Sequence, residues 1–104
     1  LKNINQVEVP KIREYSKHSF HLYVITAQKR DELFEYLRQL NIQVLIHYPR
    51  ILPNTKAYEH LNVDLSEFPN SLKKEKSIIS LPIFPNMRDD EIIYVADCIK
   101  KFYE

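Results

Sequence analysis

The sequence contains no glycine, a residue that usually makes up about seven per cent of a soluble protein. Loops that wrap a phosphate group need glycine, because only a backbone without side chains can approach the anion so closely. This absence therefore excludes a P-loop nucleotide site and a dinucleotide-binding fingerprint.

The chain also lacks an excess of charge and a long apolar run. Its 15 lysines and arginines and 14 aspartates and glutamates leave a formal net charge of +1. This balance gives no electrostatic basis for binding nucleic acid or an anionic membrane surface. No apolar stretch approaches the ~20 residues that a membrane-spanning helix needs. We therefore expect neither nucleic acid nor a membrane among its partners.

Cysteine and histidine are too few and too scattered to indicate a metal site. The only cysteine, Cys98, cannot form an internal disulfide, which is typical of a reducing compartment such as the cytoplasm. It lies among apolar residues late in a helical pattern, so we expect a small buried side chain and not a reactive thiol. Two of the four histidines, His18 and His21, are three apart on a predicted strand and would point to opposite faces. We therefore expect no bound metal.

The most regular features of the sequence are two helical patterns. Residues 29–40 place leucines at positions i, i+4 and i+7 of one face. Thr26 or Gln28 is expected to cap this helix, and Asn41 to adopt the left-handed turn that ends it. Residues 89–102 have acidic side chains in the first turn, lysines in the last turn and an apolar stripe between them. That stripe consists of Ile92, Val95, Ala96, Ile99 and Phe102.

Three short strands and two shorter helices are also predicted. Residues 18–25, 43–47 and 78–81 are rich in β-branched and aromatic side chains, as strands are. Shorter helices are expected at 55–61 and from 69 or 70 to 77, where Pro69 suits a first helical position. The side chains expected to share one face of the first strand are Phe20, Leu22 and Val24, and those expected to turn inward from 55–61 are Ala57, Tyr58 and Leu61.

This order of elements predicts one small α+β domain. We expect a small, mainly antiparallel sheet of about three strands with helices packed on one face. A chain of 104 residues is long enough for a single domain. Residues 1–17 show no clear period and are interpreted as a lead-in segment. Because the chain begins with Leu1 and not with Met, we also expect it to be a fragment of a longer protein.

The strongest candidate for a binding site is the corner His47-Tyr48-Pro49. An apolar run ends at this corner, and Pro49 fixes the backbone there. The His47 and Tyr48 side chains can both donate or accept hydrogen bonds. Chemistry alone leaves two interpretations open. The corner either binds a ligand or is a partly buried pair whose polar atoms are satisfied by backbone groups.

A series of short motifs runs along the chain from about Pro10 to the end. It comprises His21–Ile25, Arg30–Leu33 with Tyr36-Leu37, Ile42–Pro49, Ala57-Tyr58, Phe68-Pro69 and Ser80–Pro85. In this order and spacing, the series resembles the C-terminal part of the DegT/DnrJ/StrS family of sugar aminotransferases, which have the fold type I architecture. No single motif is diagnostic, and the most specific combination is the corner together with Ser80–Pro85.

The resemblance implies an enzyme that uses pyridoxal phosphate. Such an enzyme moves an amino group from an amino acid, usually glutamate, to a keto group on a nucleotide-linked sugar. It also implies that the catalytic lysine and most of the cofactor-binding residues lie in a missing N-terminal domain. No residue of this chain is therefore assigned a catalytic or cofactor-binding role, and the fragment alone is expected to be inactive. Residues 18–104 would form a C-terminal small domain, and residues 1–17 the seam to the missing one.

The same resemblance implies that His47 and Tyr48 hydrogen-bond sugar hydroxyls, with His21 as a further candidate. It implies a homodimer of the full-length protein, a cytoplasmic location and a role in polysaccharide biosynthesis. Relatives often continue the corner with a proline and a second histidine, where this chain has Ile51 and Pro53. The family's details of sugar recognition are therefore not carried over to these positions. The alternative hypothesis is a non-catalytic α+β binding or interaction domain, because the chain contains no complete catalytic set.

Overall fold

The computed structural model describes all 104 residues and contains one three-stranded antiparallel sheet in the order β1-β2-β3. The strands are β1 (Val7–Glu8), β2 (Tyr23–Ala27) and β3 (Ile78–Leu81). The α-helices are α1 (Arg30–Gln39), α2 (Pro69–Glu75) and α3 (Asp89–Tyr103), and the 3₁₀ helices are η1 (Leu52–Asn54), η2 (Lys56–Leu61) and η3 (Leu65–Glu67). The predicted α+β class and small antiparallel sheet are confirmed.

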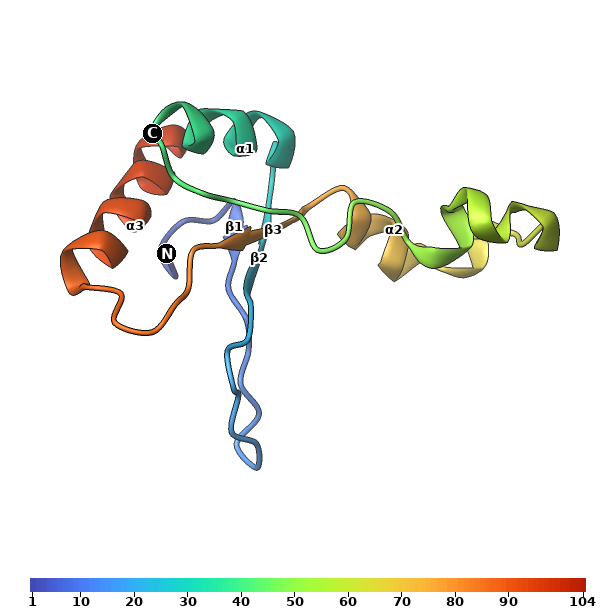
Figure 1. Ribbon diagram of the computed structural model, residues 1–104, viewed down its shortest axis with the longest axis horizontal. Coiled ribbons are helices and arrows are strands. Elements are labelled where there is room, and N and C mark those ends of the chain that lie inside the picture. The colour runs from blue at the N-terminus through green and yellow to red at the C-terminus, as the bar shows by residue number, and fades with distance from the viewer.

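The core lies between one face of the sheet and the helices α1 and α3 (Figure 1). In the antiparallel register Ile25 is paired with Ile79, and alternate residues of a strand point to the same face. The side chains of Ile25 and Ile79 are fully buried, as are Leu33 and Leu37 of α1 and Ile99 of α3. The apolar face that the helical periodicity predicts for α1 and for α3 is therefore the face that packs toward the sheet.

Both ends of α1 use backbone geometry and not side-chain caps. Lys29, at the N-terminal end, has a left-handed backbone with φ of 50°, and no side chain caps the helix there. The predicted cap by Thr26 or Gln28 is therefore wrong, because the chain turns sharply at Lys29 between β2 and the helix. Asn41 has φ of 58°, which confirms the left-handed turn expected after this helix.

The strand β2 begins later than predicted. Residues 18–22 are not in the sheet, and Phe20 has a left-handed backbone with φ of 51°. The amide of Phe20 donates to Nδ1 of His18 at 2.8 Å, and their rings stack with centroids 4.3 Å apart. A strand cannot continue through such a local turn. The prediction that Phe20, Leu22 and Val24 share one face of a strand is therefore wrong, since only Val24 lies in β2. The buried residues of β2 are Ile25 and Ala27.

Residues 43–47 form a single bridge and not a strand. Leu45 is bridged to Ser80, with backbone hydrogen bonds of 2.8 and 3.2 Å between the two residues. Ile42 and Val44 are nevertheless buried, so this segment closes the side of the core beside β3. The third strand of the sheet is instead β1, which lies within the segment expected as a lead-in and pairs with β2.

The helix α3 carries the C-terminal part of the core. Val95, Cys98 and Ile99 are its buried residues, so the prediction of a buried Cys98 is confirmed. Ile92 belongs to the predicted apolar stripe, but its side chain is half exposed. No helix of this structure, α3 included, combines the length and the apolar character that crossing a membrane requires.

Two segments project away from this core (Figure 1). One is the connection between β1 and β2, and the other is an arm of residues 48–76 that includes η1, η2, η3 and α2. None of these four helices contains a buried residue. The prediction that the 55–61 helix turns side chains inward is therefore wrong, because the arm has no core of its own to receive them. The exposed residues in question are Ala57, Tyr58 and Leu61.

Candidate functional site

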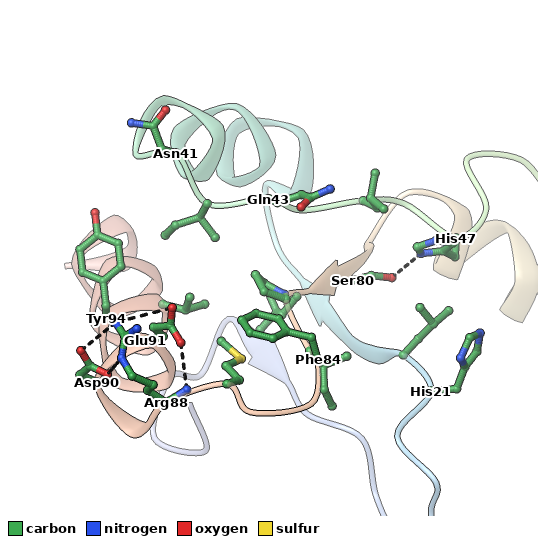
Figure 2. A pocket seen from close by; sticks show the side chains of 18 residues that line it. His21, Asn41, Gln43, His47, Ser80, Phe84, Arg88, Asp90, Glu91 and Tyr94 are labelled. Atoms are coloured by element: carbon green, nitrogen blue, oxygen red, sulfur yellow. Dashed lines mark hydrogen bonds and ion pairs between the residues drawn. The ribbon is translucent and has the colours of Figure 1, made fainter.

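A cavity of about 830 Å³ lies beside β3, between the segment 41–47 and the start of α3 (Figure 2). Eighteen residues line it, and nine of them are hydrophobic. Its walls come from four parts of the chain: the entry to β2, the segment after α1, the end of β3 with its following loop, and the first turns of α3. The cavity is therefore built by the core elements and not by the arm.

His47 lies at one end of this cavity and is held by Ser80. The Nδ1 atom of His47 and the Oγ atom of Ser80 are 2.8 Å apart (Figure 2). Ser80 is 4% exposed and lies in β3, where its backbone also pairs with Leu45. The bridge at Leu45 brings the chain to β3 two residues before His47, so the imidazole reaches the serine hydroxyl. The sheet thus fixes the position of the ring.

The second nitrogen of this ring, Nε2 of His47, has no hydrogen-bond partner within the protein. In a neutral imidazole one nitrogen donates and the other accepts. The role of Nε2 is therefore the opposite of the role that Nδ1 takes in its hydrogen bond to Ser80. Because the serine hydroxyl can take either role, Nε2 can act as a donor or as an acceptor. A ligand hydroxyl can pair with it in both cases.

The other two candidate residues, His21 and Tyr48, differ in their position relative to the cavity. His21 lines the cavity at the same end as His47 (Figure 2), and its side chain is exposed. Tyr48 does not line the cavity, and its side chain is 76% exposed. Its ring contacts that of His47 edge-on, with centroids 5.8 Å apart, and the peptide bond between these two residues is cis. The structure therefore brings His21 and His47 into one cavity and places Tyr48 beside its rim.

The opposite end of the cavity carries charged side chains that pair with one another (Figure 2). Nε of Arg88 lies 2.9 Å from Oδ1 of Asp90, and the backbone amide of Arg88 donates to Oε2 of Glu91 at 2.9 Å. The hydrogen bond from Arg88 lowers the pKa of Asp90. The same bond, together with the charge of Glu91, raises the pKa of Arg88. These three side chains serve mainly to start α3, and the positive charge of Arg88 offsets only one of the two carboxylates.

Three further cavity residues were not identified as candidates from the sequence. Ser80 orients His47, and Gln43 and Phe84 line the middle of the cavity (Figure 2). A signal existed for Ser80, because a single polar residue inside a short apolar strand is unusual unless it has a partner. No local pattern distinguishes Gln43 or Phe84 from ordinary loop residues.

This arrangement suits an uncharged part of a ligand that carries several hydroxyl groups. The cavity combines an imidazole nitrogen, an amide and an aromatic ring, which can meet the polar edges and the C–H faces of such a ligand. None of its lining residues is a lysine, so the cavity has no amine of its own for covalent chemistry. These side chains can therefore bind and orient a ligand, but they cannot form a Schiff base with it.

Comparison with known proteins adds a consistent picture. The sequence profile of the DegT/DnrJ/EryC1/StrS aminotransferase family matches residues 1–100. The chain is 34% identical over 97 residues to the pleiotropic regulatory protein of Geobacillus stearothermophilus, covering 93% of this chain and 26% of that protein. It is 31% identical over 96 residues to the dTDP-3-amino-3,6-dideoxy-α-D-galactopyranose transaminase of Aneurinibacillus thermoaerophilus, covering 92% of this chain and 26% of that enzyme.

The fold comparison agrees with the sequence comparison. The structure superposes on DesV of S. venezuelae, solved with a ketimine intermediate, with a TM-score of 0.92. That match covers 98% of this chain and 28% of DesV at 24% identity, and therefore supports the fold alone. The chain spans about a quarter of the length of the curated relatives that it matches. On the profile match over residues 1–100, the chain belongs to the DegT/DnrJ/EryC1/StrS aminotransferase family.

Proposed function

We propose that these residues are the C-terminal part of a sugar aminotransferase. The complete enzyme would move an amino group from an amino acid, glutamate being the expected donor, to a keto group on a nucleotide-linked sugar. The family membership supports the reaction class, and the name of the Aneurinibacillus relative supports a dTDP-linked sugar as the first substrate class to test. Residues 18–104 would act as the small domain, with a homodimer and a cytoplasmic location as further predictions.

Pyridoxal phosphate is the cofactor that the family implies, and the residues of this chain do not fit it. A Schiff base needs a lysine amine, and none of the eighteen cavity residues is a lysine. A cup of backbone amides for the phosphate is usually built with glycine, and the chain has none. We therefore place the attachment of the cofactor outside residues 1–104, which leaves sugar binding as the contribution of this part.

The observation that carries this proposal is the imidazole of His47, whose orientation is fixed by a hydrogen bond to Ser80. Its Nδ1 is 2.8 Å from the buried hydroxyl of Ser80, and its Nε2 is unpaired at a cavity of about 830 Å³. A pre-oriented group loses little freedom when it binds, so its hydrogen bond to a sugar hydroxyl is effective. In this proposal His21 contacts the same sugar from the entry of β2, and Tyr48 closes over it from the rim.

The test is to replace His47 by alanine in the complete protein. We expect kcat/KM for the sugar substrate to fall roughly 10- to 100-fold, because one oriented hydrogen bond is lost from the sugar complex. The kinetic constants for the amino acid should stay within about twofold. The reaction can be followed in reverse, from dTDP-linked amino sugars and 2-oxoglutarate, beginning with the sugar that names the Aneurinibacillus relative.

A matched control is His60→Ala, since His60 is an exposed histidine on η2 of the arm and does not line the cavity. It should leave the kinetics unchanged. Unchanged sugar kinetics in His47→Ala would contradict the assignment of the site.

A second candidate function is a non-catalytic binding domain. It is favoured by the cavity without a lysine and by the name of the Geobacillus relative, which is called a regulatory protein. The visible absorption spectrum of the complete protein separates the two functions. A cofactor band that shifts when glutamate is added supports the aminotransferase. A protein that takes up no pyridoxal phosphate when supplied with it supports the binding domain.

A further inference from the structure

The loop that follows His47 is held to the rest of the protein at one side chain. Within residues 48–55, the hydrogen bonds that reach a distant part of the sequence both end on the carboxylate of Glu75. The backbone amide of Ile51 donates to Oε2 at 2.7 Å, and the side-chain amide of Asn54 donates to Oε1 at 3.3 Å. The other hydrogen bonds of this loop join neighbours and fix only its local shape.

Glu75 is itself fixed to the core, so its carboxylate can hold this loop in a defined position relative to the core. It is the last residue of α2, and its backbone carbonyl accepts a hydrogen bond from Nη2 of Arg30 at 3.2 Å. The Nη1 atom of the same guanidinium donates to the carbonyl of Ile78 at 2.8 Å. Arg30 is 8% exposed at the first position of α1, so it ties the end of α2 and the start of β3 to the rigid part of the fold.

The corner is therefore held from both sides by one short segment. On the near side, Ser80 fixes the ring of His47, and on the far side Glu75 fixes the backbone at Ile51. Both holding groups lie within residues 75–80, which include the start of β3. Between the two attachments lies Tyr48, which has no hydrogen bond to the rest of the protein and no burial to hold it.

We propose that Glu75 is a positioning residue for sugar recognition, acting through the loop that carries Tyr48. This inference rests on the proposed function, because it assumes that the corner contacts the sugar. Removing the carboxylate would free the far side of the corner while leaving the bond between His47 and Ser80 in place. A displacement on the order of 1 Å in a substrate-contacting group can reduce turnover by up to about 100-fold.

The experiment compares Glu75→Ala, Glu75→Gln and Glu67→Ala in the complete protein, with His47→Ala beside them. In Glu75→Ala we expect kcat/KM for a dTDP-linked amino sugar to fall about 10-fold or more, while that for glutamate changes by less than about twofold. Glu75→Gln keeps an acceptor for the Ile51 amide and should restore most of the activity. Glu67→Ala removes an exposed carboxylate from η3 of the same arm and should have no effect.

Amide hydrogen exchange provides a readout that does not depend on turnover. The Ile51 amide should exchange faster in Glu75→Ala than in the natural protein, and at the natural rate in Glu75→Gln. A loss of activity with glutamate as well as with sugar would indicate a general folding role and overturn the inference. Normal sugar kinetics in Glu75→Ala, with a defect in His47→Ala, would overturn it and leave the proposed function intact. Normal kinetics in both would overturn the assignment of the sugar site to the corner, on which the inference rests.

Discussion

The hydroxyl of Tyr103 links the C-terminal end of α3 to the segment just before α1. The residue lies in the last turn of α3, and its Oη donates to the backbone carbonyl of Gln28, just before α1. Burial raises the pKa of Tyr103, and the nearby carboxylate of Glu32 adds to the effect. Both causes favour the protonated phenol, which is the form that can donate this hydrogen bond.

Replacing Tyr103 by phenylalanine should lower the free energy of unfolding by about 1 kcal/mol near neutral pH, because the Gln28 carbonyl loses its donor. Since the folded-state pKa is raised, the contribution of the hydroxyl is fully present below the unfolded-state value of about 10 and is lost as the pH rises through the folded-state value. The difference between the two proteins should therefore shrink at pH 11 compared with pH 8. Urea unfolding at both pH values measures this, and a gap that widens with pH would contradict the assignment.

Among single residues, the sequence identifies the candidate ligand-binding group His47 but not its contacts with the residues that hold the corner. His47 stands out because a ring that can hydrogen-bond follows an apolar run and precedes a proline. Its partner Ser80 lies 33 positions away, and Glu75 meets Ile51 across 24 positions. Neither pairing leaves a local pattern, because each depends on how β3 and the segment after α1 are placed in space. His47 could be predicted as a candidate and Ser80 stands out as a polar residue in an apolar strand, but the contact between them could not be predicted.

The helices were predictable as elements because their signals are local. The spacing of Leu33 and Leu37 sets the buried face of α1, and the observed helix differs by one residue at each end from the expected 29–40. Strands depend on partners, and there the sequence is less informative. Residues 43–47 have strand-like composition, yet only Leu45 finds a partner, at Ser80 on the edge of β3. The two residues of β1 are too few for any pattern, and pairing with β2 alone defines them.

The turn that ends α1 depends on the backbone conformation of Asn41. Asn41 has φ of 58°, a region that costs a residue with a Cβ roughly 1–2 kcal/mol unless it is asparagine or aspartate. We expect Asn41→Ala to lower the free energy of unfolding by about 1 kcal/mol. Asn41→Gly should be neutral or slightly stabilising, because glycine adopts this conformation at no steric cost.

Chemical denaturation of the three proteins checks the ordering. A glycine variant that is less stable than the alanine variant would show that the asparagine side chain, and not the backbone angle, is what the turn requires. Asn62 is a useful comparison, because it has φ of 48° at the end of η2 on the arm, where no buried residue depends on it. The same substitutions there should have smaller effects on global stability.

The molecule as a whole is more extended than a self-contained domain. Its radius of gyration is 15.5 Å, against about 13 Å for a compact chain of this length. Only 13 of its 104 residues are buried. The excess length comes from the connection between β1 and β2 and from the arm of residues 48–76, which both leave the core (Figure 1). These two projections have little burial of their own to stabilise them.

Local stability should therefore be uneven, and trypsin can map it in the isolated chain of residues 1–104. A protease needs several residues unfolded around the cut, and such opening costs little where no side chain is buried. We expect the first cuts after Lys11, Arg13 and Lys17 in the connection, and after Lys56 in the arm, all of which are exposed. Arg30, 8% exposed in α1, should be cut last.

Digestion of the same chain in a concentration of urea that unfolds it but leaves trypsin active is the control. There all sites should be cut at similar rates, which would show that the order under native conditions comes from the structure and not from the cleavage preferences of trypsin. First cuts within α1 or α3 under native conditions would contradict this view. Such cuts would show that the core has the lowest local stability in the molecule. The two projections would then have to be stabilised by contacts among their own exposed side chains.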